Sequence, residues 1–325
     1  MRFVALTVAT LCAVGTVWAQ PVISNSGDVP GLLYRAIHSA KRAHYSGRKT
    51  VEFIHNGKAI SHDEIVYRDG LKTRIEFPQG SKFSGQIIVE DEKGRKHYFP
   101  DRNEVLVLPP RREESLDRLI RLVKRAQDKK VGLSSSQGQR VAGLLTNQIV
   151  VTDGAGNITQ RIYIEPKSGI VLKRELFEAG GSRWGSFEFS QIDLDPPPFD
   201  GSLFQFERRG VHVVTPRDEL KKLVAGKEFS PVWLPPSTGF LLEESHLDKI
   251  ESTPALIESY VKKGDYQGTA KISVFELVGA VDPEQFRKFN RDEYHAASVQ
   301  KEGKTFVVVG SLDEDSLKQL LQNLN

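Results

Sequence analysis

Apolar and polar residues alternate in short runs between residues 45 and 108. In the run 71–77, Leu, Thr, Ile and Phe alternate with charged residues, which is typical of a strand with one buried and one solvated face. The runs 87–89 and 105–108 are apolar at every position, so we expect both faces of the sheet to be covered there. Turn sequences such as Asn56-Gly57 separate the runs. The pattern predicts six consecutive antiparallel strands.

The first hairpin of this series has an ambiguous register. With a two-residue turn at Asn56-Gly57, Phe53 faces Ile60 but Val51 faces His62. A β-bulge or a longer turn would bring apolar residues opposite one another. The sequence leaves both alternatives open.

One helix is expected before the six strands in the sequence and another after them. The first follows Asp28 as its cap and has Pro30 in its first turn. The second covers residues 111–130 and is amphipathic. Its expected apolar stripe comprises Leu116, Leu119, Ile120 and Val123. Its expected basic rim comprises Arg118, Arg121, Lys124 and Arg125.

Two interpretations of this second helix remain open. It is either an amphipathic helix lying on the sheet with a solvated basic face, or a lid over a cavity. In the second case the basic rim would attract anionic head groups or an acidic partner. The glycines and serines around 134–136, directly after the helix, predict a flexible loop.

Further strands are predicted at 141–151, 160–164, 170–177 and 184–192. About ten antiparallel strands would curl into an open half-barrel or close into a barrel. The predicted fold class is therefore α+β, an antiparallel half-barrel with helical cover over residues 28–206.

A linker with a short helix is predicted at 207–238, and it contains a hinge at Trp233, Leu234 and Pro235. The segment 239–325 predicts a small C-terminal α/β domain with five strands, a short helix at 283–289 and a final helix. Ser311 followed by Glu314 predicts the cap of that final helix.

Residues 1–19 have the pattern of an export signal, with Arg2 before an apolar core and a cleavage site at Val17-Trp18-Ala19. The chain has one cysteine and one methionine, and both lie in this leader. We therefore expect a periplasmic protein, soluble after cleavage, whose fold does not depend on disulfides. A net charge of +3 argues against nucleic-acid binding.

Catalytic motifs are missing from the sequence. No histidine or carboxylate cluster has metal-ligand spacing, and no serine lies in a nucleophile elbow. Gly154-Ala155-Gly156 precedes no helix, so it predicts a hairpin turn rather than a phosphate loop. We expect no enzymatic activity, no metal and no cofactor.

An apolar lining is the remaining candidate for a site. Eight residues of the six-strand series could converge on a concave face, either as an ordinary core or as the wall of a cavity for acyl chains. These residues are Ile75, Phe77, Ile87, Val89, Tyr98, Phe99, Val105 and Val107.

The layout resembles a known family. The hairpin sequence at 161–177 is similar to one in lipoprotein-carrier-like (LolA/LolB) domains. The Trp233-Leu234-Pro235 and Gly239-Phe240 elements, followed by a small domain ending in a leucine-rich helix, resemble the MucB/RseB family of periplasmic sigma-factor regulators. This chain has Pro236, Ser237 and Thr238 between the two elements, and Lys173 where such hairpins often have proline.

The resemblance implies a non-enzymatic regulator that binds the periplasmic domain of a membrane-bound anti-sigma factor. It also implies that a lipid or acyl chain relieves this binding, as part of envelope-stress signalling. The alternative is a lipid or lipoprotein carrier that uses the same cavity. Whether copies of the chain associate stays open, and no contact residue transfers from the family by motif.

Overall fold

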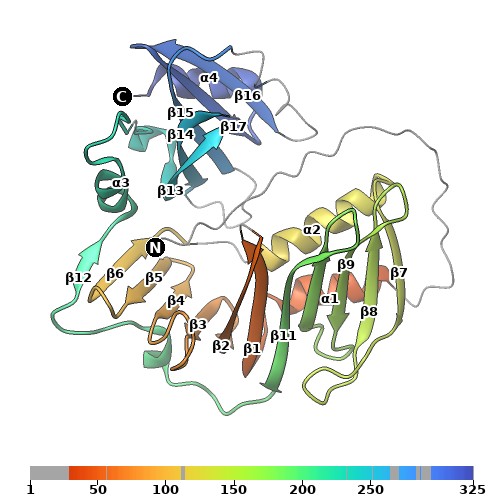
Figure 1. The fold of residues 1–325 in the computed structure, drawn as a ribbon. Coiled ribbons are helices and arrows are strands. Elements are labelled where there is room, and N and C mark those ends of the chain that lie inside the picture. The colour runs from red at the N-terminus through yellow and green to blue at the C-terminus, as the bar shows by residue number, and fades with distance from the viewer. Residues whose placement is uncertain are drawn as a thin grey trace.

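A mostly antiparallel sheet, a second, antiparallel sheet and four α-helices are present among the described residues of the computed structural model in Figure 1. The structure describes residues 29–324, except 56, 111–113, 232, 251, 264–270, 283–285 and 287–293. The predicted leader and the predicted cap Asp28 lie outside the described residues, as does most of the predicted helix at 283–289. The mostly antiparallel larger sheet and its helices confirm the α+β class.

The larger sheet has twelve strands in the order β12-β6-β5-β4-β3-β2-β1-β11-β10-β9-β8-β7. Its first half consists of the six predicted strands, β1(His44–His55), β2(Lys58–Asp69), β3(Lys72–Glu76), β4(Ile87–Asp91), β5(Gly94–Phe99) and β6(Glu104–Leu108). Its second half consists of β7(Gly132–Gln137), β8(Asn147–Thr152), β9(Ile158–Ile164), β10(Val171–Phe177) and β11(Arg183–Asp193). The last strand, β12(His212–Val214), pairs with β6 in parallel.

One face of this sheet carries the helices. Across strands, Val51 lies opposite both His62 and Phe187, Phe187 lies opposite Arg174, and Arg174 lies opposite Ile162. Directly opposed residues point to the same side, so this row marks one face, which we call the inner face. The other is the outer face.

The helices α1(Val29–Ser39) and α2(Glu114–Gln127) lie on the inner face. Apolar residues of both helices form one buried cluster with strands β8 and β9. Its fully buried members include Leu33 of α1, Ile149 of β8 and Ile162 of β9. The helical spacing of apolar residues thus matches the alternation on the strands beneath.

The outer face of β3–β5 is covered by the chain that follows β11. A short 3-10 helix, η1(Gly201–Phe204), contacts β3 and β4, and the Phe206 ring stacks on Tyr98 at 4.8 Å. Arg74 donates a hydrogen bond to the Leu203 carbonyl at 3.0 Å. The outer face of β4 is therefore next to another chain segment, as its uninterrupted apolar run predicts for that side.

The second sheet is antiparallel, in the order β13-β14-β15-β17-β16. Its strands are β13(Phe240–Ile250), β14(Thr253–Lys262), β15(Lys271–Val278), β16(His295–Lys301) and β17(Lys304–Gly310). The helices α3(Pro216–Val224) and α4(Glu314–Gln322) share one buried cluster with it. A 3-10 turn, η2(Pro236–Thr238), precedes β13.

Three local expectations are corrected. The first hairpin keeps the plain two-residue register, with Val51 opposite His62 and no bulge. The serine-rich segment expected to be a loop is strand β7, which pairs regularly with β8. The cap of α4 is Asp313, whose carboxylate accepts a hydrogen bond from the Ser316 N–H at 2.8 Å, rather than Ser311.

Candidate functional site

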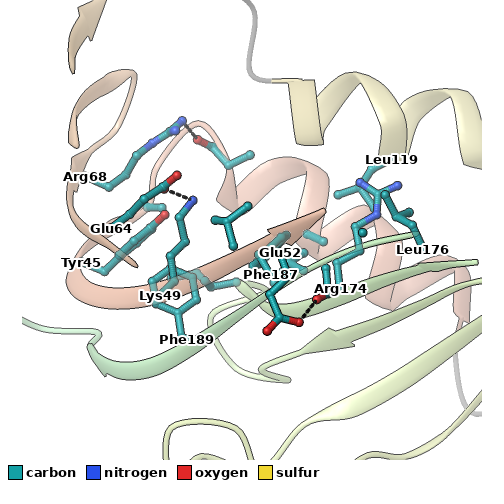
Figure 2. A pocket seen from close by; sticks show the side chains of 18 of the residues that line it. Tyr45, Lys49, Glu52, Glu64, Arg68, Leu119, Arg174, Leu176, Phe187 and Phe189 are labelled. Carbon is teal, nitrogen blue, oxygen red and sulfur yellow. Dashed lines mark hydrogen bonds and ion pairs between the residues drawn. The ribbon is translucent and has the colours of Figure 1, made fainter. Parts of the chain in front are cut away.

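A cavity of about 480 Å³ lies on the inner face, between the sheet and the two helices. Strands β1, β2, β10 and β11 form its wall, the C-terminal part of α1 closes one side, and Leu119 of α2 reaches it (Figure 2). Because β11 lies beside β1 in the sheet, segments more than 130 residues apart in sequence meet here. The cavity thus depends on long-range strand pairing.

Much of the cavity wall is apolar. Val51 and Phe187 face each other across β1 and β11, and Leu176 and Phe189 flank them. Gly185 leaves space beside Leu176, since a Cβ atom built there would lie 3.6 Å from the Leu176 Cδ1. Such a wall suits the hydrocarbon part of a ligand, because each buried methylene contributes about 0.8 kcal/mol.

One end of the cavity is charged. The Lys49 Nζ lies 2.9 Å from the Glu64 Oε2, and the His62 Nε2 lies 3.0 Å from the Glu64 Oε1. Burial by itself raises the pKa of Glu64, but Lys49 and His62 outweigh burial and lower it from 4.5 to about 2. Glu64 therefore stays ionised at any physiological pH.

Two guanidinium groups also belong to the polar part of the lining. Arg68 donates to the carbonyl oxygens of Ala40 and Gly70, at 2.7 Å each, and so joins the end of α1 to β2. Arg174 is buried and donates to the Gln160 Oε1 at 2.6 Å. An apolar wall with a few fixed charges is the usual composition of a small-molecule site.

The close packing of α1 depends on a glycine. Gly169, in the turn between β9 and β10, has φ +74°, and a Cβ there would lie 2.8 Å from the Arg35 carbonyl. The Ser39 hydroxyl donates to the Gly169 carbonyl at 3.0 Å. This contact fixes the side of the cavity that α1 forms.

The residues expected in the lid differ in their burial and in whether they contact the cavity. Leu119 is buried and lines the cavity, Val123 is half-buried, and Ile120 is 39 % exposed. Leu122, which was not part of the expected stripe, is buried instead. The side chains of Leu116 and Arg118 lie outside the described part of the chain.

The rest of the basic rim, Arg121, Lys124 and Arg125, is exposed on α2. None of the three lines the cavity. The expected rim is therefore a cationic helix surface on the side away from the apolar wall.

The eight apolar residues expected to converge do not share a face. Following the register from the inner-face pair Val66–Ile75 places Ile75, Phe77 and Phe99 on the inner face. The same register places Ile87, Val89, Tyr98, Val105 and Val107 on the outer face. None of the eight lines the cavity, and Val107 is 37 % exposed. In strands that are covered on both sides, apolar character does not reveal which face a residue occupies.

The expected hinge and linker take part in the packing of both units. Leu234 is 2 % exposed in the core of the C-terminal unit, with Trp233 packed against that core. The Arg217 guanidinium lies 4.9 Å from the Trp233 ring centroid. The predicted linker supplies β12 to the first sheet and α3 to the second core. Pro235 precedes the η2 turn.

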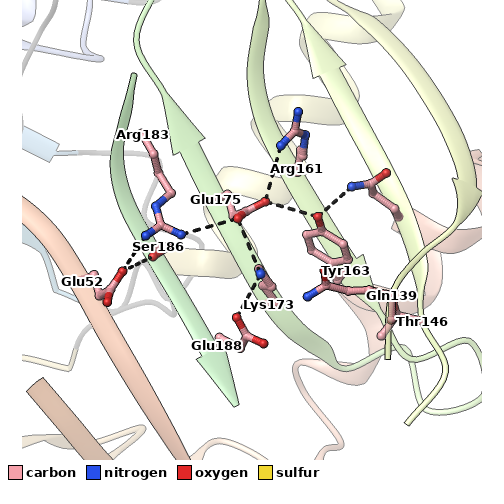
Figure 3. A network of polar contacts seen from close by, with 11 residues as sticks. Glu52, Gln139, Thr146, Arg161, Tyr163, Lys173, Glu175, Arg183, Ser186 and Glu188 are labelled. Carbon is pink, nitrogen blue, oxygen red and sulfur yellow. Dashed lines mark hydrogen bonds and ion pairs between the residues drawn. The ribbon is translucent and has the colours of Figure 1, made fainter. Parts of the chain in front are cut away.

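The outer face opposite the cavity is polar and its charges pair with one another (Figure 3). Arg183 pairs with Glu52 at 2.8 Å, and Lys173 pairs with Glu188 at 2.9 Å. Burial lowers the pKa of Lys173, but Glu188 and Glu175 outweigh burial and raise it. Cross-strand pairs of opposite charge stabilise a sheet face.

The described residues hold neither a candidate metal site nor a candidate membrane-spanning helix. No group of three or more histidine, cysteine, aspartate or glutamate side chains in this part of the chain could hold a metal ion. No helix among the described residues is long and apolar enough to span a bilayer.

No protein-family model matches the chain, and no curated protein matches it significantly. Solved structures are similar in arrangement. A Pseudomonas aeruginosa MucA/MucB complex is 19 % identical over 92 % of this chain and 99 % of that chain, with a TM-score of 0.45. MucB in complex with MucA(peri) is 18 % identical over 92 % and 98 %, with a TM-score of 0.44.

A LolA-superfamily protein from Nitrosomonas europaea is also similar, at 7 % identity over 52 % of this chain and 94 % of that chain, with a TM-score of 0.25. MucB and LolA-superfamily structures, the two groups that the sequence resembles, are thus both among the similar structures.

Proposed function

We propose that this chain is an exported, non-enzymatic regulator whose inner-face cavity takes the acyl part of an amphiphile. The supporting observation is the 480 Å³ cavity between α1 and strands β1, β2, β10 and β11. Ligand sites usually have about 300–1,000 Å³ and a mostly apolar wall with a few polar groups. In this proposal the larger sheet acts as an open half-barrel, with α2 as its cover.

The proposed partner is the periplasmic domain of a membrane-bound anti-sigma factor. The choice of partner rests on the sequence resemblance to the MucB/RseB family. In this proposal, an amphiphile in the cavity weakens the partner complex, which couples envelope damage to transcription. The export signal at residues 1–19 would place the mature chain in the same compartment as such a partner.

A binding experiment with the mature chain tests both the proposed partner and the proposed effect of the amphiphile. The chain, starting at Gln20, is immobilised and presented with the periplasmic domains of the anti-sigma factors encoded in the same genome. We expect one domain to bind, and a lysophospholipid below its critical micelle concentration to release it. Binding of none of these domains would refute the regulator.

The variant Gly185→Leu shows whether release acts through the cavity, because a leucine at this position fills space beside Leu176. We expect this variant to hold the partner in the presence of lysophospholipid. The matched control is Gly154→Leu, in an exposed turn where a Cβ meets no atom within 4 Å. This control should release the partner as the wild type does. Equal release from all three proteins would place the amphiphile elsewhere.

A carrier function would give a different result with the same protein. A carrier passes its bound acyl chain to acceptor vesicles, whereas a regulator keeps or exchanges it without net transfer. Transfer of a fluorescent acyl ligand from the mature chain to empty vesicles, without any protein partner, would therefore favour the carrier.

A further inference from the structure

The second half of α2 and the turn after it form a strongly cationic surface. Five basic side chains, Arg121, Lys124, Arg125, Lys129 and Lys130, are exposed here, with Asp128 as the one carboxylate of residues 121–130. Ile120 lies beside them and is 39 % exposed. We call Ile120, Asp128 and these five basic residues the basic surface.

At the end of the helix, a cation occupies a position whose backbone conformation favours glycine. Lys129 has φ +57°, and the N–H of Lys130 donates to the Arg125 carbonyl at 2.8 Å to close the helix. Glycine usually occupies this left-handed position, and another residue costs about 1 kcal/mol. After α3 the chain does use a glycine, Gly226, with φ +72°.

The helix dipole explains only part of this charge. Cations in the last turn of a helix are favoured by about 0.3–1 kcal/mol each, and the effect fades within one turn. Arg121 lies more than one turn before the helix end at Gln127, and Lys129 and Lys130 lie beyond it. The basic surface is thus larger than helix stability requires.

The opposite side of α2 faces the protein. Leu119 and Leu122 are buried there, and Leu119 lines the cavity. The cations therefore point away from the cavity, and none of them lines it. A charged helix surface with an exposed apolar residue at its side suits an extended anionic plane better than a folded acidic partner.

We propose that the basic surface docks this chain on an anionic lipid membrane, with α2 parallel to the membrane and Ile120 at the head-group boundary. This orientation would put the cavity directly behind the helix that contacts the lipid. The docking does not depend on whether the cavity binds a ligand, so it can fail or succeed separately from the proposed function.

Co-sedimentation of the mature chain with vesicles tests this proposal. We expect binding to vesicles of phosphatidylcholine with about one third phosphatidylglycerol, and none to phosphatidylcholine alone. Raising the salt from 50 mM to 500 mM should release the protein, since exposed charges are screened over a few ångströms at that ionic strength. Binding that ignores both lipid charge and salt would overturn the proposal.

The variant Lys129→Gly separates binding from folding. It removes one cation and relieves the left-handed strain, so its melting temperature should be equal to or above that of the wild type. Each basic residue at an anionic surface contributes about 1 kcal/mol, so the partition coefficient should fall about fivefold. The matched control Lys249→Gln removes one exposed cation from the C-terminal unit and should bind as the wild type does.

Two results would overturn the role of the basic surface. One is a Lys129→Gly protein that binds anionic vesicles as tightly as the wild type. The other is an equal loss in Lys249→Gln, which would show a response to net charge instead of a defined surface. Binding to an acidic peptide but to no vesicle would assign the surface to a protein partner and would also refute membrane docking.

Discussion

His97, on β5, is an imidazole that the fold holds in its neutral form. Its Nε2 lies 2.9 Å from the Gln86 Oε1, and its ring centroid lies 4.0 Å from that of Phe99. Burial lowers the pKa of His97, and Arg95 and Arg102 lower it further, from 6.5 to about 3. Between these two values, His97 is protonated in the unfolded chain and neutral in the folded one.

The consequence is a pH-dependent free energy of unfolding. Since the unfolded state binds the extra proton, stability falls as the pH drops from 6.5 toward 3. From pH 7 to pH 5, the free energy of unfolding of the wild type should fall by about 2 kcal/mol more than that of His97→Gln. Urea denaturation at the two pH values measures this. Glu64 loses its stabilising ionisation at lower pH, from 4.5 toward 2, and therefore contributes little in this window.

An identical pH dependence of the unfolding free energy for wild type and His97→Gln would contradict the claim that folding holds His97 neutral. His246 also has a pKa lowered by burial, so some pH dependence should remain in the variant. The test is thus the difference between the two proteins and not the slope of either one.

At the scale of elements, the contact between α1 and the β9–β10 turn defines one side of the cavity. Gly169 and Gly181 both have positive φ, at +74° and +81°, but only Gly169 lies against another segment. Alanine at either position is strained by about 1–2 kcal/mol. We expect Gly169→Ala to cost at least about 1 kcal/mol more than Gly181→Ala, because its Cβ meets the Arg35 carbonyl.

Chemical denaturation of the two variants gives the comparison directly. Equal destabilisation would mean that α1 moves without cost, and that this side of the cavity is not fixed by close packing. Hydrogen exchange of α1 amides should rise in Gly169→Ala and stay unchanged in Gly181→Ala.

Local sequence patterns predicted many of the elements, for identifiable reasons. The hairpin turns, together with the period-two and the continuous apolar runs between them, specify β1–β6 by themselves. By contrast, β7 has little intrinsic strand preference and is a strand because β8 pairs with it. The cap of α4 lies two residues from the expected one because Asp313 also bonds the Ser316 hydroxyl.

The cavity could not be predicted in this way. Its wall exists because β11 closes onto β1, and sequence periodicity does not reveal which distant strands become neighbours. The unusual register of the first hairpin was the one sequence feature that pointed to this region. Val51 and His62 face each other without a bulge, since His62 packs against Phe83 at 4.9 Å and bonds Glu64.

At the scale of the whole molecule, ion pairs join the large sheet to the C-terminal unit. The Lys222 Nζ lies 3.1 Å from the Glu104 Oε1, and Arg95 lies 3.9 Å from Glu243. Among the described residues, no hydrophobic cluster combines side chains of the large sheet with those of the small sheet. The Lys222–Glu104 pair is partly exposed, and exposed ion pairs are weak and sensitive to salt, so we expect the relative position of the units to depend on ionic strength.

Charge exchange tests this contact. Small-angle X-ray scattering should show a larger radius of gyration for Lys222→Glu than for wild type at 50 mM salt. The double variant with Glu104→Lys should return toward the wild-type value, because opposite charges again face each other. At 500 mM salt all three proteins should agree. Identical scattering under all conditions would contradict an ionic contact between the units.

The central claim is that the inner-face cavity holds an acyl chain, and native mass spectrometry of the freshly purified mature chain tests it most directly. We predict a reproducible mass adduct bearing an acyl chain on the wild type and on Gly154→Leu. Gly185→Leu, whose leucine occupies the same space, should be folded and lack the adduct. An unmodified mass for the wild type in the presence of added lysophospholipid, or an equal adduct on Gly185→Leu, would contradict the claim.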